Sequence, residues 1–278
     1  MHKTAQSTIT LNNNVDIPYL GLGTWLSNGK DCEDAVAYAL NHGYTMIDTA
    51  QAYDNEHEVG NGWKASGKRR EELFITTKIR NSNQGYERSQ QSFEKSLRAL
   101  QTDYVDLLLI HWPYIGDFDR SIDTWRALIE MRAEGICRSI GVSNFTIPLI
   151  EEIIEKTGIV PAVNQVEFHV FLYQKELLDY CRKKHIQIEA YSPIAKAKFL
   201  DNAVLLEIAQ KYQKTSAQVM LSWCINHDIV VIPKSVNQAR IEENAAIFFE
   251  MDEEDMKVLD DLGPETRLIR GRWAPPSW

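Results

Sequence analysis

Polar side chains that can act as acids, bases or hydrogen-bond donors lie at or just past the C-terminal ends of short apolar runs at several points along the chain. They are Asp48, Lys78, His111, Asn144, Gln165, Tyr191 and Lys234. A single case could be a helix cap, because polar residues often begin the helix after a strand. The mixture of acid, base, amide and phenol is better explained by one polar active site at the ends of several strands.

Two of these residues carry opposite charges and follow neighbouring apolar runs. Asp48 and Lys78 could pair at the rim of a folded core, since buried charges are tolerated mainly when they are paired. A purely structural salt bridge is an alternative for this pair considered alone.

The apolar runs themselves have the length of buried strands. They span residues 19–22, 44–47, 73–77, 105–110, 136–142, 163–168, 186–190 and 229–232. Between them, apolar residues recur at helical spacing, as at Phe93, Leu97 and Leu100. This alternation predicts an α/β fold, a (β/α)8 TIM barrel of parallel strands, with an open doubly wound sheet as the alternative. In a barrel the strand ends would share one mouth.

Both ends of the chain fall outside this alternation. Residues 8–11 and 15–17 flank three asparagines, which predicts an N-terminal β-hairpin that closes the bottom of the barrel. The tail over residues 263–278 is rich in Pro and Trp and is expected to be a short irregular loop segment over the barrel. No linker interrupts the chain, so we expect a single domain over residues 1–278.

Composition narrows the class of partner. The formal net charge of -9 argues against nucleic acid or an anionic membrane as the main partner. The 4 cysteines lack CxxC or Cys/His pairing, so no metal site or disulfide framework is expected. The first residues lack a signal peptide's apolar core, and no apolar run has membrane-spanning length. We therefore expect a cytoplasmic protein, a monomer, that acts on a small molecule.

Six short motifs resemble the aldo-keto reductase family, in particular its bacterial diketogluconate and glyoxal reductase-like members. They are IDTAQAYDNE (47–56), TTKI (76–79), LLLIHWP (107–113), GVSNF (141–145), AYSP (190–193) and IPKSVNQARIEEN (232–244). The motifs occur in the family's order and cover nearly the whole chain. The resemblance implies NADPH-dependent reduction of aldehydes or ketones, with small aldehydes, α-dicarbonyls or keto sugars as expected substrates.

The same resemblance implies a catalytic group of Asp48, Tyr53, Lys78 and His111. Carbonyl reduction needs a hydride for the carbon and a proton for the oxygen, so an acid must stand beside the nicotinamide. Tyr53 is the expected acid, with its pKa lowered by the Lys78 ammonium that Asp48 holds in place. His111 is expected to donate a hydrogen bond to the carbonyl oxygen.

For the cofactor, NADPH or NADP+, the resemblance implies an extended dinucleotide across the barrel mouth. Ser143, Asn144 and Gln165 would hold the carboxamide, and Tyr191 would stack on the nicotinamide. Lys234 and Arg240 would bind the 2'-phosphate, which favours NADPH over NADH because that phosphate needs charge-assisted hydrogen bonds. The other positions assigned to the cofactor are Gly23, Thr24, Trp25, Asp48, Ser192, Pro193, Ile232, Ser235, Val236, Asn237, Glu243 and Asn244.

Aromatic residues near the mouth could line a substrate pocket. The candidates for contact with the carbonyl substrate are Trp25, Tyr53, His111, Trp112 and Trp273. Structural packing is an equal explanation for Trp273. Phe199, in the basic loop with Lys196 and Lys198, is a weaker candidate for a strap over the pyrophosphate.

Other readings of the sequence remain open. GLGTWL (21–26) and GNGWKA (60–65) imitate a Rossmann fingerprint, but neither has both the spacing and the preceding strand. A metal-dependent hydrolase could use Asp48, His111 and His169, although no HxH pair is present. The main alternative is a non-catalytic NADPH-binding regulatory barrel.

Overall fold

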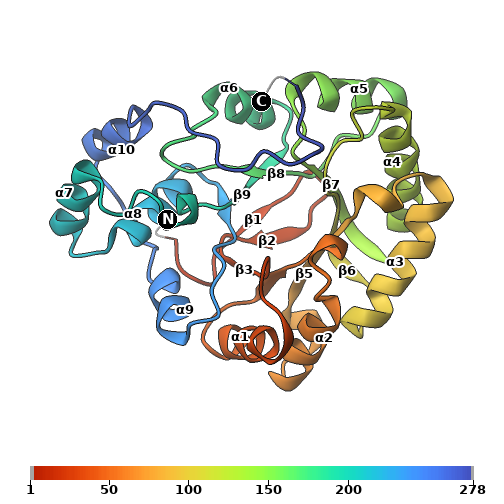
Figure 1. The fold of residues 1–278 in the computed structure, drawn as a ribbon, viewed down its shortest axis with the longest axis horizontal. Helices are drawn as coiled ribbons and strands as arrows, with labels where there is room; N and C mark the ends of the chain where they lie inside the picture. Colours follow the sequence, from red (N-terminus) through yellow and green to blue (C-terminus); the bar gives the residue numbers. More distant parts are fainter. Residues whose placement is uncertain (1–2, 277–278) are drawn as a thin grey trace.

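The computed structural model describes residues 3–276 and contains an eight-stranded parallel sheet curved into a nearly closed barrel (Figure 1). The strands are β3 (Gly21–Gly23), β4 (Met46–Asp48), β5 (Phe74–Ile79), β6 (Val105–Ile110), β7 (Cys137–Ser143), β8 (Val163–Glu167), β9 (Gln187–Tyr191) and β10 (Val230–Val231). Each strand pairs with the next along the chain, and single bridges from Leu20 to Val231 and from Gly23 to Lys234 join the two edges. The predicted (β/α)8 fold is confirmed, and the open sheet is not observed.

Helices surround the strands in Figure 1. The α-helices are α1 (Gly29–Asn41), α2 (Glu56–Ala65), α3 (Tyr86–Leu100), α4 (Phe118–Ala133), α5 (Ile147–Thr157), α6 (Lys175–Lys183), α7 (Ala203–Tyr212), α8 (Ser216–Asn226), α9 (Gln238–Ala245) and α10 (Glu253–Asp260). Four 3-10 turns are η1 (Gln51–Tyr53), η2 (Arg70–Glu72), η3 (Asn81–Asn83) and η4 (Ala195–Ala197). Their apolar faces pack inward, as where α3 buries Phe93 and Leu100 at the predicted spacing.

The barrel closes where its first and last strands meet, and glycine makes that contact possible. A Cβ at Gly23 would lie 2.7 Å from the backbone oxygen of Ile232, directly after β10. Real Cβ atoms do not approach that closely, so a larger residue would push β3 away from β10. Gly23 therefore allows the ends of these two strands to come together at the mouth.

The N-terminal hairpin consists of β1 (Thr8–Thr10) and β2 (Asp16–Pro18), which pair antiparallel. Its buried Leu11 and Ile17 belong to the same apolar cluster as Met46, Leu107 and Leu109 from the barrel strands. The hairpin thus fills the barrel floor, as predicted, and the polar strand ends lie at the opposite rim.

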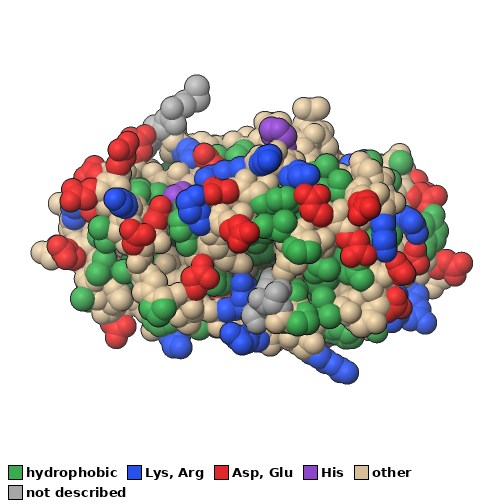
Figure 2. Space-filling model, turned by 90° about the horizontal axis from the view of Figure 1, so that it is seen from above, with side chains coloured by type: hydrophobic (Ala, Val, Ile, Leu, Met, Phe, Trp, Pro, Cys, Tyr) green, Lys and Arg blue, Asp and Glu red, His purple; other side chains and the backbone are tan. Residues whose placement is uncertain are grey.

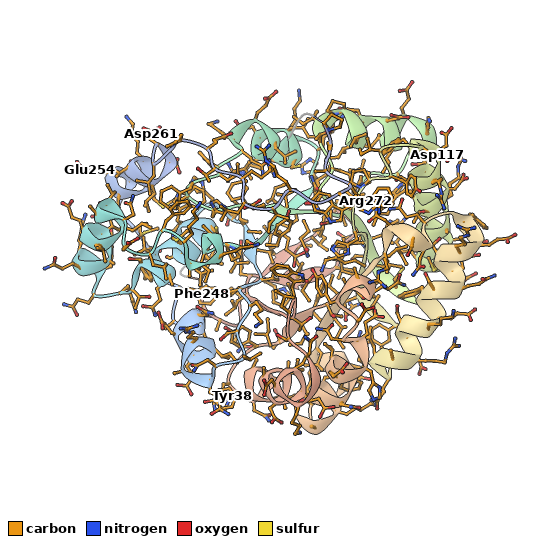
Figure 3. All side chains as sticks on the ribbon, in the orientation of Figure 1. Tyr38, Asp117, Phe248, Glu254, Asp261 and Arg272 are labelled. Carbon is orange, nitrogen blue, oxygen red and sulfur yellow. The ribbon has the colours of Figure 1, made fainter. Side chains whose placement is uncertain are left out.

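The C-terminal tail, defined here as residues 263–276, contains no helix or strand. In Figure 1 it runs from α10 across the barrel toward β8 and β7, and in Figure 3 the labelled Arg272 lies over the strands, whereas Tyr38 and Glu254 lie on the outer helices. The prediction of an irregular segment over the barrel holds for these residues; Ser277 and Trp278 lie outside the described part. Within residues 3–276, none of the helices combines the length and the apolar composition that a membrane span requires.

Candidate active site

A buried ion pair lies at the centre of the mouth and supports a tyrosine. Lys78, at the end of β5, donates hydrogen bonds from Nζ to Asp48 Oδ1 at 2.5 Å and to the backbone oxygen of Thr49 at 2.8 Å. The Tyr53 hydroxyl oxygen lies 3.4 Å from the same Nζ. Asp48 and Lys78 are 1% and 0% exposed, so this pair is screened from water. The predicted pairing across the mouth is present.

Tyr53 is held in place by the turn that carries it. It ends η1, directly after β4, and the neighbouring Gln51 is buried. The Gln51 amide donates to Ser96 Oγ at 3.0 Å and accepts from the backbone N–H of Arg80 at 3.0 Å. These bonds tie the turn to α3 and to the end of β5. The phenol is therefore fixed relative to Lys78 before any ligand binds.

The electrostatics of the group favour an ammonium beside a protonated phenol. Burial alone would lower the pKa of Lys78, but the charge of Asp48 raises it above its usual value. Burial also raises the pKa of Tyr53, and the Lys78 ammonium only partly opposes that rise. The Lys78 ammonium thus lowers the pKa of Tyr53 as predicted, but burial raises that pKa by more, so the predicted net lowering is not observed. The phenol keeps its proton at neutral pH and is poised to donate it.

His111 follows β6 and completes the group. Its ring lies edge-on to that of Tyr53, with the ring centroids 5.5 Å apart. Burial, together with the positive charges of Lys78 and Arg80, lowers the pKa of His111 well below its usual value. The imidazole is therefore neutral at pH 7 and has one N–H to donate. A neutral donor suits a carbonyl oxygen that is about to receive a proton from Tyr53.

An amide network borders the ion pair. Gln165 on β8 donates from Nε2 to Asp48 Oδ2 and to Glu189 Oε2, both at 2.8 Å. Gln165 and Glu189 are register partners on β8 and β9, so the sheet itself places them side by side. On the other side, Asn144 accepts from the Tyr191 hydroxyl at 2.8 Å and donates to the backbone oxygen of His111 at 2.9 Å.

One groove connects these residues. Its volume is about 520 Å³, and its walls include most of the positions predicted from the sequence. Those predicted positions are Gly23, Thr24, Trp25, Asp48, Tyr53, His111, Trp112, Ser143, Asn144, Gln165, Tyr191, Ser192, Pro193, Ile232, Lys234 and Arg240. The walls also contain Leu26, Ala52, Ile194, Ala197, Ile269 and Gly271, which the sequence analysis missed, and Lys196, which it named only as part of the basic loop around Phe199.

The missed wall residues fall into two kinds. Ile269 and Gly271 belong to the tail, whose path no periodicity predicts. Leu26 and Ala52 stand next to motif residues, so nothing in their own types distinguishes them. Lys78 lies behind Asp48 and Tyr53 and reaches the groove through them rather than lining it.

The cationic end of the groove lies before α9. Lys234 and Arg240 are exposed and line the groove. The Asn237 side chain caps α9 by accepting from the backbone N–H of Arg240 at 3.1 Å, and the Ser235 hydroxyl accepts from the N–H of Asn237. Val236 is exposed beside them.

Two further positions assigned to the cofactor lie deeper in α9 and away from the groove walls. Glu243 accepts a hydrogen bond from the Thr215 hydroxyl at 2.6 Å, so its carboxylate is engaged with the start of α8. Asn244 is buried, 6% exposed. The structure does not bring either side chain to the wall formed by Lys234 and Arg240.

The three tryptophans predicted to contact substrate are not equivalent. Trp25 is 43% exposed, and the Lys196 ammonium lies 4.9 Å from the centre of its ring. Trp112 lines the groove beside His111. Trp273 packs on Tyr114, with ring centroids 4.8 Å apart, and does not reach the groove wall. For Trp273 the packing interpretation fits better.

Glu189 is a buried acid that the sequence analysis did not single out. It is 0% exposed, and its Oε1 has no hydrogen-bond partner among the described residues. Burial first, and then the negative charge of Asp48, raise the pKa of Glu189 to about 8. The signal was a glutamate within the predicted buried strand 186–190, where an acid must be neutral, paired or both.

We expect the substitution Glu189→Gln to stabilise the protein at alkaline pH. A folded pKa of about 8 against an ordinary value of 4.5 means that the folded state binds more protons between these two values. The wild type therefore loses stability as pH rises through this window, whereas glutamine does not titrate. At pH 8 the melting temperature of the variant should exceed that of the wild type by several degrees, whereas at pH 5 the two melting temperatures should agree. An equal difference between variant and wild type at both pH values would contradict the raised pKa of Glu189. So would the same gain at pH 8 in Glu71→Gln, a control at an exposed glutamate.

The alternative of a metal site finds no constellation to support it. Within residues 3–276, no group of three or more His, Cys, Asp or Glu side chains is arranged to hold an ion. His169, one of the proposed ligands, is paired with Glu167 at 3.2 Å.

On the face of the molecule drawn in Figure 2, acidic and basic side chains are interspersed.

Comparison with known proteins agrees with this geometry. The chain matches the Aldo/keto reductase family over residues 19–264. It is 49% identical to "Glyoxal reductase" of Bacillus subtilis over 96% of this chain and 97% of the relative, and 42% identical to "Methylglyoxal reductase DkgA" of Yersinia pestis over 95% and 96%.

Solved structures show the same fold. An aldo/keto reductase from Brucella melitensis superposes with a TM-score of 0.89 at 43% identity, covering 92% of this chain and 99% of that one. A mutant of Gox0644 in complex with NADPH superposes with a TM-score of 0.90 at 36% identity, covering 94% of both chains. The family model, the relatives and the solved structures each match nearly the full length of the chain. The chain therefore belongs to the aldo/keto reductase family of oxidoreductases.

Proposed function

We propose that this protein reduces small aldehydes and α-dicarbonyls to alcohols with NADPH, and that Tyr53 donates the proton. One observation carries the proposal: the Tyr53 hydroxyl lies 3.4 Å from a buried lysine that is paired with Asp48, and it opens on the groove beside His111. A phenol held between an ammonium and a neutral imidazole is suited to protonating an oxygen that gains negative charge.

The roles of the four side chains follow from their chemistry. NADPH, when bound, would supply the hydride for the carbonyl carbon. Tyr53 donates its proton to the carbonyl oxygen, and the Lys78 ammonium stabilises the phenolate that remains. Asp48 keeps Lys78 charged and oriented, while a His111 N–H holds the carbonyl oxygen in line with the phenol.

The groove suits a dinucleotide. At one end, the side chains of Ser143, Asn144 and Gln165 offer an amide-rich wall beside the catalytic group, and Tyr191 offers a ring face. At the other end, Lys234 and Arg240 offer two cations next to the capped start of α9. We propose that the first set holds the nicotinamide and the second set the 2'-phosphate.

The substitution Arg240→Ala should weaken NADPH binding and leave NADH binding nearly unchanged. A charge-assisted hydrogen bond to the extra phosphate is lost, so we expect the Kd for NADPH to rise ~10-fold to ~100-fold. Fluorescence titration with both cofactors measures the two constants. Lys257→Ala, which removes an exposed cation on α10, is the matched control. An equal loss for both cofactors would place Arg240 elsewhere than at the phosphate.

Substrate class follows from the pocket and from what the relatives are named for. The wall around Trp25, Trp112 and Ile269 is largely apolar, which suits a small carbonyl compound rather than a polyanion. NADPH consumption should be followed with glyoxal, methylglyoxal, simple aldehydes and keto sugars, and repeated with NADH. We expect fastest turnover of an α-dicarbonyl with NADPH. Tight NADPH binding without turnover of any substrate would favour the non-catalytic regulatory barrel.

We also propose that the protein acts as a cytoplasmic monomer. The complete catalytic group comes from β4, η1, β5 and the end of β6 of one chain, so no second copy is needed to build it. Light scattering at assay concentration should give the mass of one chain, 31.9 kDa. A stable dimer would contradict this part of the proposal.

A further inference from the structure

We propose that Glu167 is a positioning residue that clamps the C-terminal tail over the mouth and thereby sets the affinity for the carbonyl substrate. The substrate part of this inference rests on the proposed function. The carboxylate ends β8 and is 0% exposed. Its Oε1 accepts the backbone N–H of Leu268 at 2.8 Å, and its Oε2 accepts that of Ile269 at 2.9 Å.

The clamp is reinforced on both sides. His169 Nε2 lies 3.2 Å from Glu167 Oε1, and the backbone oxygen of Glu167 accepts a bond from Gln174 Nε2 at 2.7 Å. Gln174 in turn accepts from the Arg267 guanidinium at 2.8 Å through its Oε1. Arg267, which precedes Leu268 and Ile269, is thus tied through Gln174 to the end of β8. Three consecutive tail residues are fixed to one point of the barrel.

Glu167 is charged when it performs this role. Burial would raise the pKa of Glu167, but hydrogen bonds from His169 and from the two tail N–H groups lower it below its usual value. Bonds from N–H donors to an ionised carboxylate are stronger than those between neutral groups. A buried carboxylate satisfied by the backbone of a segment without regular structure is well suited to fixing that segment in one place.

The clamped segment leads directly to the groove. Ile269 and Gly271 line the wall that contains Tyr53, His111 and Trp112. A Cβ at Gly271 would lie 3.1 Å from the Trp112 ring, so the tail packs closely on that indole. The position of the clamp therefore decides how far the tail wall stands from the catalytic group. The cationic end of the groove, near Lys234 and Arg240, is built from other segments.

Glu167→Gln tests the clamp, because glutamine keeps the size but has one acceptor oxygen instead of two. Its NH2 group would face one of the tail N–H donors, so at least one of the two bonds is lost. We expect the KM for the α-dicarbonyl substrate to rise ~10-fold, with kcat within ~3-fold of the wild type, as for a loss of uniform substrate binding. The Kd for NADPH should not change. Glu151→Gln on α5 makes the same chemical change away from the mouth and should behave as the wild type.

A double-mutant cycle shows whether Glu167 acts through the tail. A chain that ends at Arg267 lacks both clamped N–H groups, and its KM should rise at least as much as that of Glu167→Gln. In the shortened chain, Glu167→Gln should have no further effect. An equal KM increase in the full and shortened chains would overturn the proposal, as would a loss of NADPH affinity or of kcat alone in Glu167→Gln.

Hydrogen exchange read by mass spectrometry tests tail docking without activity. The peptide containing Leu268 and Ile269 should exchange faster in Glu167→Gln than in the wild type, while barrel peptides keep their rates. Unchanged tail exchange would overturn the clamp, and faster exchange with unchanged KM would overturn its role in substrate binding. If the wild type itself turns over no carbonyl substrate, the proposed function fails, but tail exchange still decides whether Glu167 holds the tail.

Discussion

Replacing Tyr53 by phenylalanine should remove carbonyl reduction almost completely and leave NADPH binding intact. Phenylalanine keeps the ring beside His111 but has no proton to give, and a positioned general acid contributes ~10²-fold to ~10⁴-fold to rate. We therefore expect kcat to fall at least ~10²-fold. Steady-state assays give kcat, and fluorescence titration gives the Kd for NADPH, which should stay within ~2-fold because the ring is retained.

The matched control is Tyr38→Phe, which removes a phenol from α1 at the outer surface (Figure 3). The Tyr38 hydroxyl donates a short hydrogen bond to Glu242 on α9 and contacts none of the four catalytic side chains. That variant should keep wild-type kcat. Turnover by Tyr53→Phe within ~10-fold of the wild type would show that another group, or water, supplies the proton.

Replacing Lys78 by methionine should damage both stability and catalysis. The substitution leaves the Asp48 carboxylate buried without its cation, and breaking a buried pair in this way costs about 3–5 kcal/mol of unfolding free energy. It also removes the charge that stabilises the Tyr53 phenolate, so kcat should fall by at least ~10²-fold. Chemical denaturation and steady-state assays measure the two effects.

The double variant with Lys78→Met and Asp48→Asn separates the two consequences. Neutralising Asp48 removes the unpaired charge, so most of the lost stability should return, while Gln165 can still hydrogen-bond to the new side chain. Activity should not return, because the phenolate still lacks its ammonium. Recovery of both stability and activity would mean that Lys78 serves the fold and has no role in the chemistry.

The barrel was predictable because its strands are buried on both faces. Residues 105–110 contain one polar residue, Asp106, and agree with β6; residues 136–142, with Arg138 and Ser139, agree with β7 to within a residue. The shorter strands were placed less well: residues 44–47 were predicted, whereas β4 is Met46–Asp48. Asp48 belongs to the strand itself because its backbone is in register with Gly23 on β3 and with Thr76 on β5, a pairing that no local pattern reveals.

The site was predictable to the extent that it lies at strand ends. Asp48 and Lys78 lie at the C-terminal ends of β4 and β5, and His111 directly follows β6, so the fold alone brings them to one rim. Glu189 and Glu167 were missed, because each depends on partners more than twenty residues away in the chain: Asp48 for the first and the tail for the second. Their only signal was an acid inside a run predicted to be a buried strand.

The sequence also could not show which residues of the motif 232–244 line the groove and which are directed elsewhere by α9. Glu243 and Asn244 stand in the same motif as Lys234 and Arg240, yet α9 directs Glu243 to Thr215 and buries Asn244. Helix phase decides which side of a motif reaches a ligand, and that phase depends on where the helix begins. Here the cap at Asn237 sets it.

Hydride transfer assisted by Tyr53 is tested most directly by following an isotope label through one turnover. NADPH deuterated at the reactive C4 position is mixed with methylglyoxal and excess enzyme, and the product is analysed by mass spectrometry and NMR. We expect one deuterium on the newly formed carbinol carbon, at a rate that the Tyr53→Phe variant lowers at least ~10²-fold. Product without deuterium on that carbon, or equal rates in the two proteins, would contradict hydride transfer assisted by this tyrosine.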